Sequence, residues 1–571
     1  MRSESVPWKT WSQEAFDLSR ETGRPLLVLL TAFYREEACE AIRAELEEGA
    51  LGTLLCRSFV AIAADTDRHP QIALRYSLCS VPSVLILASD GSPLAVFTNL
   101  DPRRMKSALS GLATCAAQCG PGLAPGLGSC SVPYVPTSGS GLERGLEALE
   151  SIRSRVEDAL PRLDSHEYTA QQRIEALRFL IRLSACTGEK GMLTRVSESL
   201  HETAHSALYD PVEGGFFGGM NPSGPMTHKL LHQNADWLIL ALRVGVEPGA
   251  AFARGLAKGV FHYLQTHLLR PGGGFRNAQR EDPGYYALSG EGRRRLAAPP
   301  LDDTVYAAPN ALTVRALCKG WQLLGEETYL GQAMSTFEFL SSAIEGPDGT
   351  VAHAFDGSPS GAGYLDDAVE MGRAYLALYL STLDPRYLEG VRRMARQVAR
   401  DFKNPAGEGF LDMRLPLHGR HLAERRMVDP ALSARAASFL LLASVQLEED
   451  TLAAPARGAL GALLGSPLED LEALSLTGSA LLVALFPMAV FEAITDGSRE
   501  QRFRILERLR QLGPSYAAIL QRGPIPREGM QRLPRLVGHC GSQRFEVVVE
   551  DPLHEGIAIS PVCLGPPTCD I

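Results

Sequence analysis

The stretch DPVEGGFFGG (residues 210–219) is a glycine-rich turn that runs into aromatic residues, and turns of the same kind recur along the chain. The others are RPGGGFRNA (270–278), GPDGTVAHAF (346–355) and NPAGEGFLDM (404–413), at spacings of roughly 60–75 residues. Glycines permit tight turns with positive φ. We expect the aromatic or aliphatic residue that follows them to pack inward.

Each turn follows a pair of segments with helical periodicity. The pairs are 168–185 with 190–207, 229–244 with 250–268, 305–324 with 327–344, and 363–382 with 385–402. A repeat of helix, helix and turn predicts a toroid of helical hairpins. Two further pairs, near 430–464 and 470–512, would make six hairpins and close an (α/α)6 toroid. The alternative is an open α-solenoid.

The first 118 residues have a different pattern, in which helices alternate with strands. After a first helix at 12–23, the predicted order is β-α-β-α-β-β-α. Its helices lie at 36–55, 69–78 and 101–118 and its strands at 24–33, 58–67 and 81–97, the last split by the hairpin signal SDGS. This is the arrangement of a thioredoxin-like α/β fold. The segment SVPS (80–83) falls where thioredoxins hold a cis-proline, so Pro82 is a candidate for that bond.

These patterns predict a multi-domain protein. We expect a thioredoxin-like domain at 1–118, a Gly/Pro/Ser-rich linker at 119–142, the six-hairpin toroid at 143–515 and a strand-containing appendage at 516–571. The appendage is predicted from RFEVVVED (544–551) and GIAISP (556–561).

Composition narrows the class of protein. The 571 residues are 45% hydrophobic and 21% charged, with a net charge of −10. An acidic chain without a concentrated basic face argues against nucleic acid or an anionic membrane as partner. The start of the chain lacks a signal-peptide core, and no uninterrupted apolar run of about 18 residues occurs. The 11 cysteines are too scattered for a disulfide framework. We therefore expect a cytoplasmic protein.

Several stretches resemble the spermatogenesis-associated protein 20 family, which includes bacterial thioredoxin domain-containing (DUF255) proteins. They are TWSQEAFDLSRETGRPLLVLL (10–30), FVAIAADTDRHPQIALRY (59–76), HKLLHQNADWLILAL (228–242), PPLDDTVYAAPNALTVRAL (299–317) and GYLDDAVEMGRAYLALYLSTLDPRYL (363–388). They are collinear and cover nearly the whole chain. The resemblance implies a thioredoxin-like domain joined to a six-hairpin glycosidase-like toroid.

The chain departs from this family at the redox turn. Where the family carries Cys-His-Trp-Cys-His, this sequence reads YREEAC (34–39), so that Arg35 and Ala38 take the two Cys positions. Dithiol exchange needs two sulfurs about one helical turn apart, and only Cys39 is near. The departure predicts a redox-silent domain kept for shape or for contact with a protein partner. The alternatives are a non-standard pair of Cys39 with Cys79, or two buried thiols without a redox role.

In the toroid, we expect the sugar site near the glycine turns, where acids, histidines and aromatics gather. Resemblance to sugar 2-epimerases and six-hairpin glycosidases implies a His base next to a carbonyl or a carboxylate pair flanking a glycosidic bond. The candidate catalytic residues are His228, His232, Asp302, Asp303, Asp366 and Asp367. The candidate substrate-binding residues are Asn234, Trp237, Glu370, Asp412 and Asp429.

Some of these residues have a simpler structural interpretation. His228 and His232 share a helix face at i, i+4, where either can serve the core. Asp366 precedes a helix and can cap it, and the pair Asp302–Asp303 has the same double interpretation.

No cofactor and no metal are predicted. Phosphate loops, Rossmann fingerprints and HExxH motifs are not found in the sequence. Cys563 and Cys569, with Cys540 and His539 upstream, offer a zinc alternative, but metal sites prefer C-x2-C ligand pairs.

The preferred interpretation is a two-domain protein whose toroid binds, and can process, a carbohydrate-like small molecule. Two alternatives from other classes stay open: a non-catalytic scaffold, and a thiol oxidoreductase that acts through Cys39.

Overall fold

The computed structural model describes residues 6–76, 81–98, 105–112, 145–163, 165–414, 426–486, 490–494, 498–512, 518–522, 535–540 and 543–548. The predicted linker at 119–142, Cys79, Cys563 and Cys569 lie outside these residues, as do the side chains of His539 and Cys540. The chain divides into two compact units. Unit 1 comprises Met1–Tyr134 with the short segments Ala278–Glu281 and Met413–Met427, and unit 2 comprises the rest.

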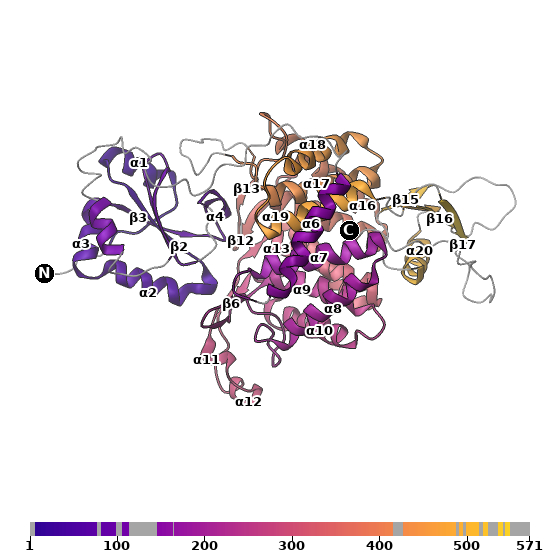
Figure 1. Ribbon diagram of the computed structural model, residues 1–571, viewed down its shortest axis with the longest axis horizontal. Helices are drawn as coiled ribbons and strands as arrows, with labels where there is room; N and C mark the ends of the chain where they lie inside the picture. Colours follow the sequence, from indigo (N-terminus) through magenta and orange to yellow (C-terminus); the bar gives the residue numbers. More distant parts are fainter. Residues whose placement is uncertain are drawn as a thin grey trace. The chain divides into compact units, whose positions relative to one another are not determined.

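Unit 1 is built on a five-stranded mixed sheet in the order β1-β3-β2-β4-β5 (Figure 1). Its strands are β1 (Lys9–Thr10), β2 (Leu26–Thr31), β3 (Val60–Asp65), β4 (Ser83–Leu87) and β5 (Pro93–Phe97). Strands β1 and β2 are parallel to β3, whereas β4 is antiparallel to β2 and to β5. The sheet is therefore mixed, with a parallel centre and an antiparallel edge.

The helices of unit 1 cover both faces of this sheet because successive strand residues point to opposite sides. Leu27 and Leu29 share one core with Leu46, Leu51 and Leu55, which come from α2 (Glu36–Glu47) and α3 (Gly49–Ser58). On the other face, the neighbouring strand residues pack with α1 (Gln13–Thr22) and α4 (Pro70–Tyr76). A further helical segment occupies residues 105–112, and η1 (Phe33–Arg35) and β9 (Ala278–Gln279) complete the unit.

The structure corrects one element of the predicted order. The single helix expected at 36–55 is two helices, because Glu48 adopts an extended conformation and Gly49 has a φ of 53°. Only glycine adopts this left-handed conformation without steric cost, so the break follows from one residue between two good helix formers. The Val81–Pro82 peptide bond is cis, as predicted from SVPS.

Unit 2 contains a closed ring of six helices. The ring helices are α7 (Ala170–Thr187), α9 (Leu231–Gly245), α13 (Ala307–Leu324), α15 (Leu365–Thr382), α17 (Pro430–Leu447) and α19 (Leu471–Leu485). Each packs on the next in this order, and α19 packs on α7 again. The open solenoid is therefore wrong, and the helices form the closed toroid that the turn repeat predicts.

A second helix lies against each ring helix on the outside. These outer helices are α8 (Lys190–His205), α10 (Ala251–Tyr263), α14 (Glu327–Ala343), α16 (Pro385–Asp401), α18 (Ala453–Leu464) and α6 (Gly145–Ala159). The first five follow their ring helix in the sequence, as predicted. The sixth does not: α19 packs against α6, the first helix of the unit, and not against a helix within 470–512.

The four glycine turns have one common geometry. In each, an isolated antiparallel bridge joins the residue before the turn to the residue after the glycines, in the pairs Tyr209–Phe216, Leu269–Phe275, Glu345–Val351 and Lys403–Phe410. Short strands extend these turns: β6 (Gly219–Asn221), β7 (Gly224–Met226), β8 (Lys229–Leu230), β10 (Leu301–Asp302), β11 (Val305–Tyr306), β12 (Ala352–Phe355) and β13 (Pro359–Ala362). The turns thus stand before the N-terminal ends of the ring helices that follow them. Short helical segments complete this part of unit 2: η4 (Leu160–Arg162), η5 (Leu264–Leu268), α11 (Pro283–Tyr286), α12 (Gly290–Arg293) and η7 (Asp450–Leu452).

The C-terminal part of unit 2 returns to strands. β14 (Val490–Ile494), β15 (Ala518–Arg522), β16 (Arg535–Cys540) and β17 (Gln543–Val548) form a sheet in the order β15-β14-β16-β17, and α20 (Arg499–Leu512) precedes β15. The sheet thus takes its first strand from before residue 516. The Ile519 backbone oxygen accepts hydrogen bonds from Tyr379 Oη (2.9 Å) and Gln446 Nε2 (2.8 Å), which fixes β15 to α15 and α17.

Among the described residues, one helix is long and apolar enough to cross a membrane. It is the ring helix α17, and 72% of its apolar window is buried inside the structure. Its apolar character is accounted for by its place in the ring.

Candidate functional site

Charged side chains recur at the same positions of the ring helices. Because 3.6 residues make one helical turn, the second, sixth, ninth and thirteenth residues of a helix share one face. On α7 these positions hold Gln171, Glu175, Arg178 and Arg182, and on α9 they hold His232, Asp236, Ile239 and Arg243. The other ring helices contribute Arg315 and Lys319 (α13), Asp366, Glu370 and Arg373 (α15), Arg435 (α17) and Glu472 (α19).

Ion pairs between different helices show that these charged faces meet inside the ring. Arg178 Nη1 lies 2.6 Å from Asp236 Oδ1, which joins α7 to α9. Arg315 Nη1 lies 2.5 Å from Glu370 Oε2, which joins α13 to α15. These pairs are buried, so each charge depends on its partner.

Arg435 connects its own helix, α17, to three other ring helices. Its Nη2 lies 2.9 Å from Glu472 Oε1 on α19 and 3.7 Å from Glu175 Oε1 on α7, and its Nη1 lies 3.4 Å from Asp366 Oδ1 on α15. The Arg435 guanidinium therefore brings carboxylates from three helices to one point on the ring axis. We call Arg435, Glu472, Asp366 and His232 the axial acid/base group.

The residues of this group have strongly shifted pKa values. Burial, reinforced by the nearby Glu175, raises the pKa of Glu472 to about 8. Burial likewise raises the pKa of Asp366 to about 6 against the attraction of Arg435. Burial and the positive Arg435 lower the pKa of His232 to about 4. At neutral pH, Glu472 is thus protonated and His232 is neutral, a combination of proton donor and proton acceptor.

Glu370 behaves in the opposite way. Burial alone would raise its pKa, but Arg315 and Arg373 outweigh burial and lower the pKa to about 2. Arg373 Nη1 lies 2.7 Å from Glu370 Oε1. Glu370 is a permanent anion in this network, which suits charge balance and not proton transfer.

Of the candidates named from sequence, His232, Asp366 and Glu370 lie in this axial network. Asp366 is not the cap of α15: Tyr364 occupies the N-cap position and Asp366 is the second helical residue. The capping interpretation of Asp366 is therefore wrong.

Asn234 and Trp237 hold the first glycine turn. Asn234 Oδ1 accepts from Phe216 N (2.7 Å), and its Nδ2 donates to Phe216 O (3.1 Å) and Leu230 O (2.9 Å). Trp237 is buried and stacks on Phe216 with a centroid distance of 4.4 Å. Both side chains are occupied by the turn.

His228 and Asp367 are also buried and engaged locally. A Cβ on Gly218 would come within 1.9 Å of His228 Nε2, so the ring packs directly on that glycine. Asp367 Oδ2 lies 2.8 Å from His353 Nδ1, and Asp367 Oδ1 accepts from Ala308 N (3.2 Å).

The remaining acidic candidates lie at the turns. Asp302 Oδ1 accepts from Thr304 N (3.0 Å), whereas Asp303 is 71% exposed and pairs with Arg276. Asp429 caps α17 through a hydrogen bond from Leu432 N to Oδ1 (2.9 Å), and burial raises its pKa. Asp412 is buried, and its backbone oxygen accepts from Leu365 N (2.9 Å).

Sequence reasoning missed Arg435, Glu472, Glu175 and Asp236. The sequence does contain a signal for these residues, because charged side chains recur one and two helical turns apart on helices that are otherwise apolar. A charged residue on the core side of a buried helix needs a partner, and such residues on several helices of one ring are candidates for a common site.

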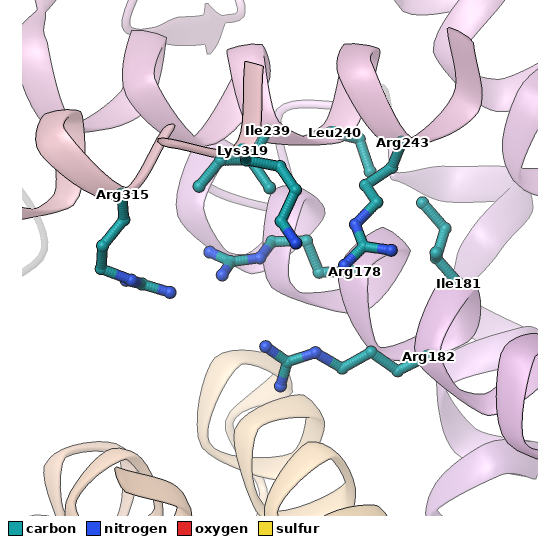
Figure 2. Close-up of a pocket in the computed structure, with 8 residues that line it drawn as sticks. All are labelled: Arg178, Ile181, Arg182, Ile239, Leu240, Arg243, Arg315 and Lys319. Carbon is teal, nitrogen blue, oxygen red and sulfur yellow. The ribbon is translucent and has the colours of Figure 1, made fainter. Parts of the chain in front are cut away.

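A cavity lies on the same axis, toward the C-terminal ends of the ring helices. It is lined by Arg178, Ile181, Arg182, Ile239, Leu240, Arg243, Arg315 and Lys319. Figure 2 shows the cationic ends of these side chains turned toward a common space.

In unit 1, the positions of the redox turn lack thiol chemistry. Cys39 is buried, and burial raises the pKa of its thiol to about 11. Arg35 Nε lies 3.1 Å from Glu281 Oε1, on the short segment that belongs to this unit, and Ala38 is half-buried. Among the described residues, no group of three or more His, Cys, Asp or Glu side chains is placed to hold a metal ion.

No family model and no curated protein matches this chain. Three solved structures that it resembles are a sugar epimerase from a ruminal bacterium, a cellobiose 2-epimerase from Bacillus thermoamylovorans B4167 and a family 76 glycoside hydrolase from a bovine Bacteroides thetaiotaomicron strain. Their sequence identities are 14%, 8% and 12%, and their TM-scores are 0.43, 0.44 and 0.45. The matches cover 55%, 55% and 71% of this chain and 85%, 86% and 83% of the other chains. At these TM-scores, the resemblances assign neither a fold nor an activity to this chain.

Proposed function

We propose that unit 2 is a sugar-active enzyme whose acid/base chemistry takes place at the axial acid/base group. The observation that carries this proposal is that His232, Asp366 and Glu472, from three helices, all have shifted pKa values and all respond to Arg435. Groups with pKa values pushed apart by their surroundings are typical of acid/base catalysis.

The reaction that suits this group is proton removal from a carbon next to a sugar carbonyl. Neutral His232 takes the proton, and the electron pair moves onto the carbonyl oxygen. Protonated Glu472 donates a proton to that oxygen, and Arg435 stabilises the negative charge that develops there. The enediol then turns its other face to His232, takes the proton from it at carbon and returns the oxygen-bound proton to Glu472, which gives the epimer and restores both groups.

A direct test is solvent-deuterium exchange into reducing sugars. The full chain is incubated with D-glucose, D-mannose or cellobiose in D2O, and deuterium at C2 is followed by NMR. Exchange is expected with the wild type and is expected to fall at least about 100-fold in His232→Asn and Glu472→Gln, since a positioned acid or base contributes 10²–10⁴-fold. His262→Asn, on the outer helix α10, is the matched control.

Two of the three carboxyl groups beside Arg435 favour a second candidate, glycoside hydrolysis. Asp366 and Glu472 are then the carboxyl pair, and the raised pKa of Glu472 suits a general acid. Release of nitrophenol from nitrophenyl glycosides, lost in Asp366→Asn, would support hydrolysis. If neither assay gives activity and sugars do not bind, the scaffold interpretation is favoured.

We also propose that unit 1 is a redox-silent thioredoxin-like domain, and that the chain is a divergent member of the spermatogenesis-associated protein 20 family. The strand order, the cis bond before Pro82 and the replacement of both thiols at Arg35 and Ala38 support this proposal. A protein partner of this domain is a further proposal.

A further inference from the structure

The charged side chains that line the cavity on the ring axis are all positive. Five of its lining residues are cations, and none of the described residues that line it is a carboxylate. These cations come from three helices: Arg178 and Arg182 from α7, Arg243 from α9, and Arg315 and Lys319 from α13. Arg178, Arg182, Arg315 and Lys319 are more than nine-tenths buried, and Arg243 is partly buried.

The acids of the axis lie at the other end of the network. Glu175, Asp236 and Glu370 occupy the sixth positions of their helices, whereas Arg182, Arg243 and Lys319 occupy the thirteenth positions. Seven residues at 1.5 Å each separate the two levels by about 10 Å along the axis. These acids form ion pairs with Arg178, Arg315, Arg373 and Arg435, and two of these arginines, Arg178 and Arg315, also line the cavity.

We propose that this cavity binds the phosphate group of a small phosphorylated molecule. Guanidinium groups match phosphate oxygens with paired N–H donors, and a lysine adds a compact positive charge. Two guanidinium groups and one ammonium at one level, from three separate helices, can enclose a phosphate from three directions. The enclosed volume of the cavity is only about 20 Å³, so a bound phosphate would have to move the long side chains of Arg182, Arg243 and Lys319 apart.

The electrostatics of the cations support an anionic occupant. Burial, followed by the charges of Arg243, Arg315 and Arg182, lowers the pKa of Lys319 well below its usual value. Burial and Arg373 lower the pKa of Arg315 to about 9. Like charges held together in a protein interior are unfavourable, and a bound dianion would offset that repulsion.

Thermal unfolding of the full chain tests phosphate binding without any need for turnover. Inorganic phosphate, glucose 6-phosphate and glucose are compared with sodium chloride at matched ionic strength. Ligand that binds only the folded protein raises the unfolding temperature. We expect phosphate or glucose 6-phosphate to raise it, and glucose alone to have little effect.

Two variants assign the effect to the cavity. Lys319→Met and Arg243→Gln are expected to weaken phosphate binding at least tenfold, and Lys258→Met, an exposed lysine on α10, serves as the matched control. Without ligand, Lys319→Met is expected to unfold at a higher temperature than the wild type, because it removes a buried charge from a repulsive group. If Lys319 only stabilises the fold, Lys319→Met should instead unfold at a lower temperature than the wild type.

Two results would overturn the proposal. One is the absence of stabilisation by phosphate or glucose 6-phosphate beyond that of chloride. The other is equal stabilisation of the wild type and both cavity variants, which would place the anion elsewhere. If Lys319→Met does not fold, two other measurements distinguish the same outcomes. They are the thermal unfolding of Arg243→Gln with phosphate, and the broadening of the phosphate signal in phosphorus NMR by the wild type. Because no turnover is measured, failure of the sugar assays would leave this result standing.

Discussion

Arg435 is the residue on which the account of the axial site depends. It is the common partner of Glu472, Asp366 and Glu175, and its charge adds to the effect of burial in lowering the pKa of His232. A methionine at this position would leave buried acids without their cation, so Arg435→Met is expected to abolish activity and to destabilise unit 2. Loss of activity in this variant could not be separated from loss of stability. Arg435 is therefore a poor position for a catalytic test, and Glu472 is a better one.

Glu472→Gln should stabilise the protein at high pH. The pKa of Glu472 is raised to about 8 in the folded state, from a usual value of 4.5. Its contribution to stability is therefore fully present below about pH 4.5 and is lost as the pH rises through about 8. The variant cannot ionise, so near pH 8 it is expected to be more stable by about 4 kcal/mol, because one pKa unit corresponds to about 1.4 kcal/mol.

Urea unfolding of the wild type and of Glu472→Gln near pH 5 and near pH 8 measures this difference. The gain should shrink as the pH falls toward about 4.5. A variant that is less stable by the same amount at both pH values would show that Glu472 is an ordinary ion-pair partner of Arg435.

Cys39 is expected to be chemically inert. Its thiol is buried and has a pKa of about 11, so little thiolate exists near neutral pH. In the native protein, alkylation of Cys39 with iodoacetamide, followed by peptide mass spectrometry, should be much slower than in urea. Rapid labelling of native Cys39 near neutral pH would revive the thiol oxidoreductase alternative.

At the scale of elements, the join between a ring helix and the turn before it recurs through the unit. The fourth residue of α9, α13 and α17 is Asn234, Asn310 or Ser433, and each bonds both backbone groups of the aromatic residue in the preceding turn. Asn310, for example, accepts from Phe275 N (2.7 Å) and donates to Phe275 O (3.1 Å). These side chains lock each turn onto its helix.

Asn310→Ala is expected to cost about 2–4 kcal/mol, because two buried backbone groups lose their partner. Asn310→Ser should recover part of the loss, since Ser433 makes both contacts in the corresponding place on α17. The midpoint of urea unfolding measures both changes. Asn221→Ala, at the last residue of β6, is the control. Equal loss in the alanine and serine variants would contradict this account of the turn.

The sequence predicts these elements well because their signals are local. The glycine turns, the paired amphipathic helices and the hairpin of unit 1 each follow from neighbouring residues. The functions of Asn234 and Trp237 were not predictable in this way. A polar or aromatic residue near a turn suggests a ligand site, and only the structure shows that Phe216 already occupies both side chains.

At the scale of the whole molecule, the ring closes through residues about 300 apart in sequence. Arg155 Nη2 of α6 donates to Leu468 O (2.6 Å) before α19, and a Cβ on Gly478 would come within 2.9 Å of Ile152. Local periodicity cannot reveal such a pairing, which explains why the sixth hairpin was sought within 470–512. The charged axis was missed for the same reason, since its residues meet only when the ring is closed.

Ile152→Ala tests this closure. Ile152 is buried in α6 against α19, and truncation of a buried isoleucine costs about 2–5 kcal/mol. Leu146→Ala on the same helix is the control, because Leu146 is 65% exposed. Thermal unfolding should show a clear loss for the first variant only. Equal, small effects would show that α6 is not part of the ring.

The most direct test of the central claim is the pH dependence of deuterium exchange at C2 of a reducing sugar. The account predicts activity throughout the range from about pH 5 to 7, with a change near pH 6 as Asp366 ionises beside Arg435. The rate should fall below about pH 4, as His232 gains a proton, and above about pH 8, as Glu472 loses one. The exchange rate of Glu472→Gln should not show this fall at alkaline pH. An acid limb at the ordinary histidine pKa of about 6.5, or no exchange at any pH, would contradict it.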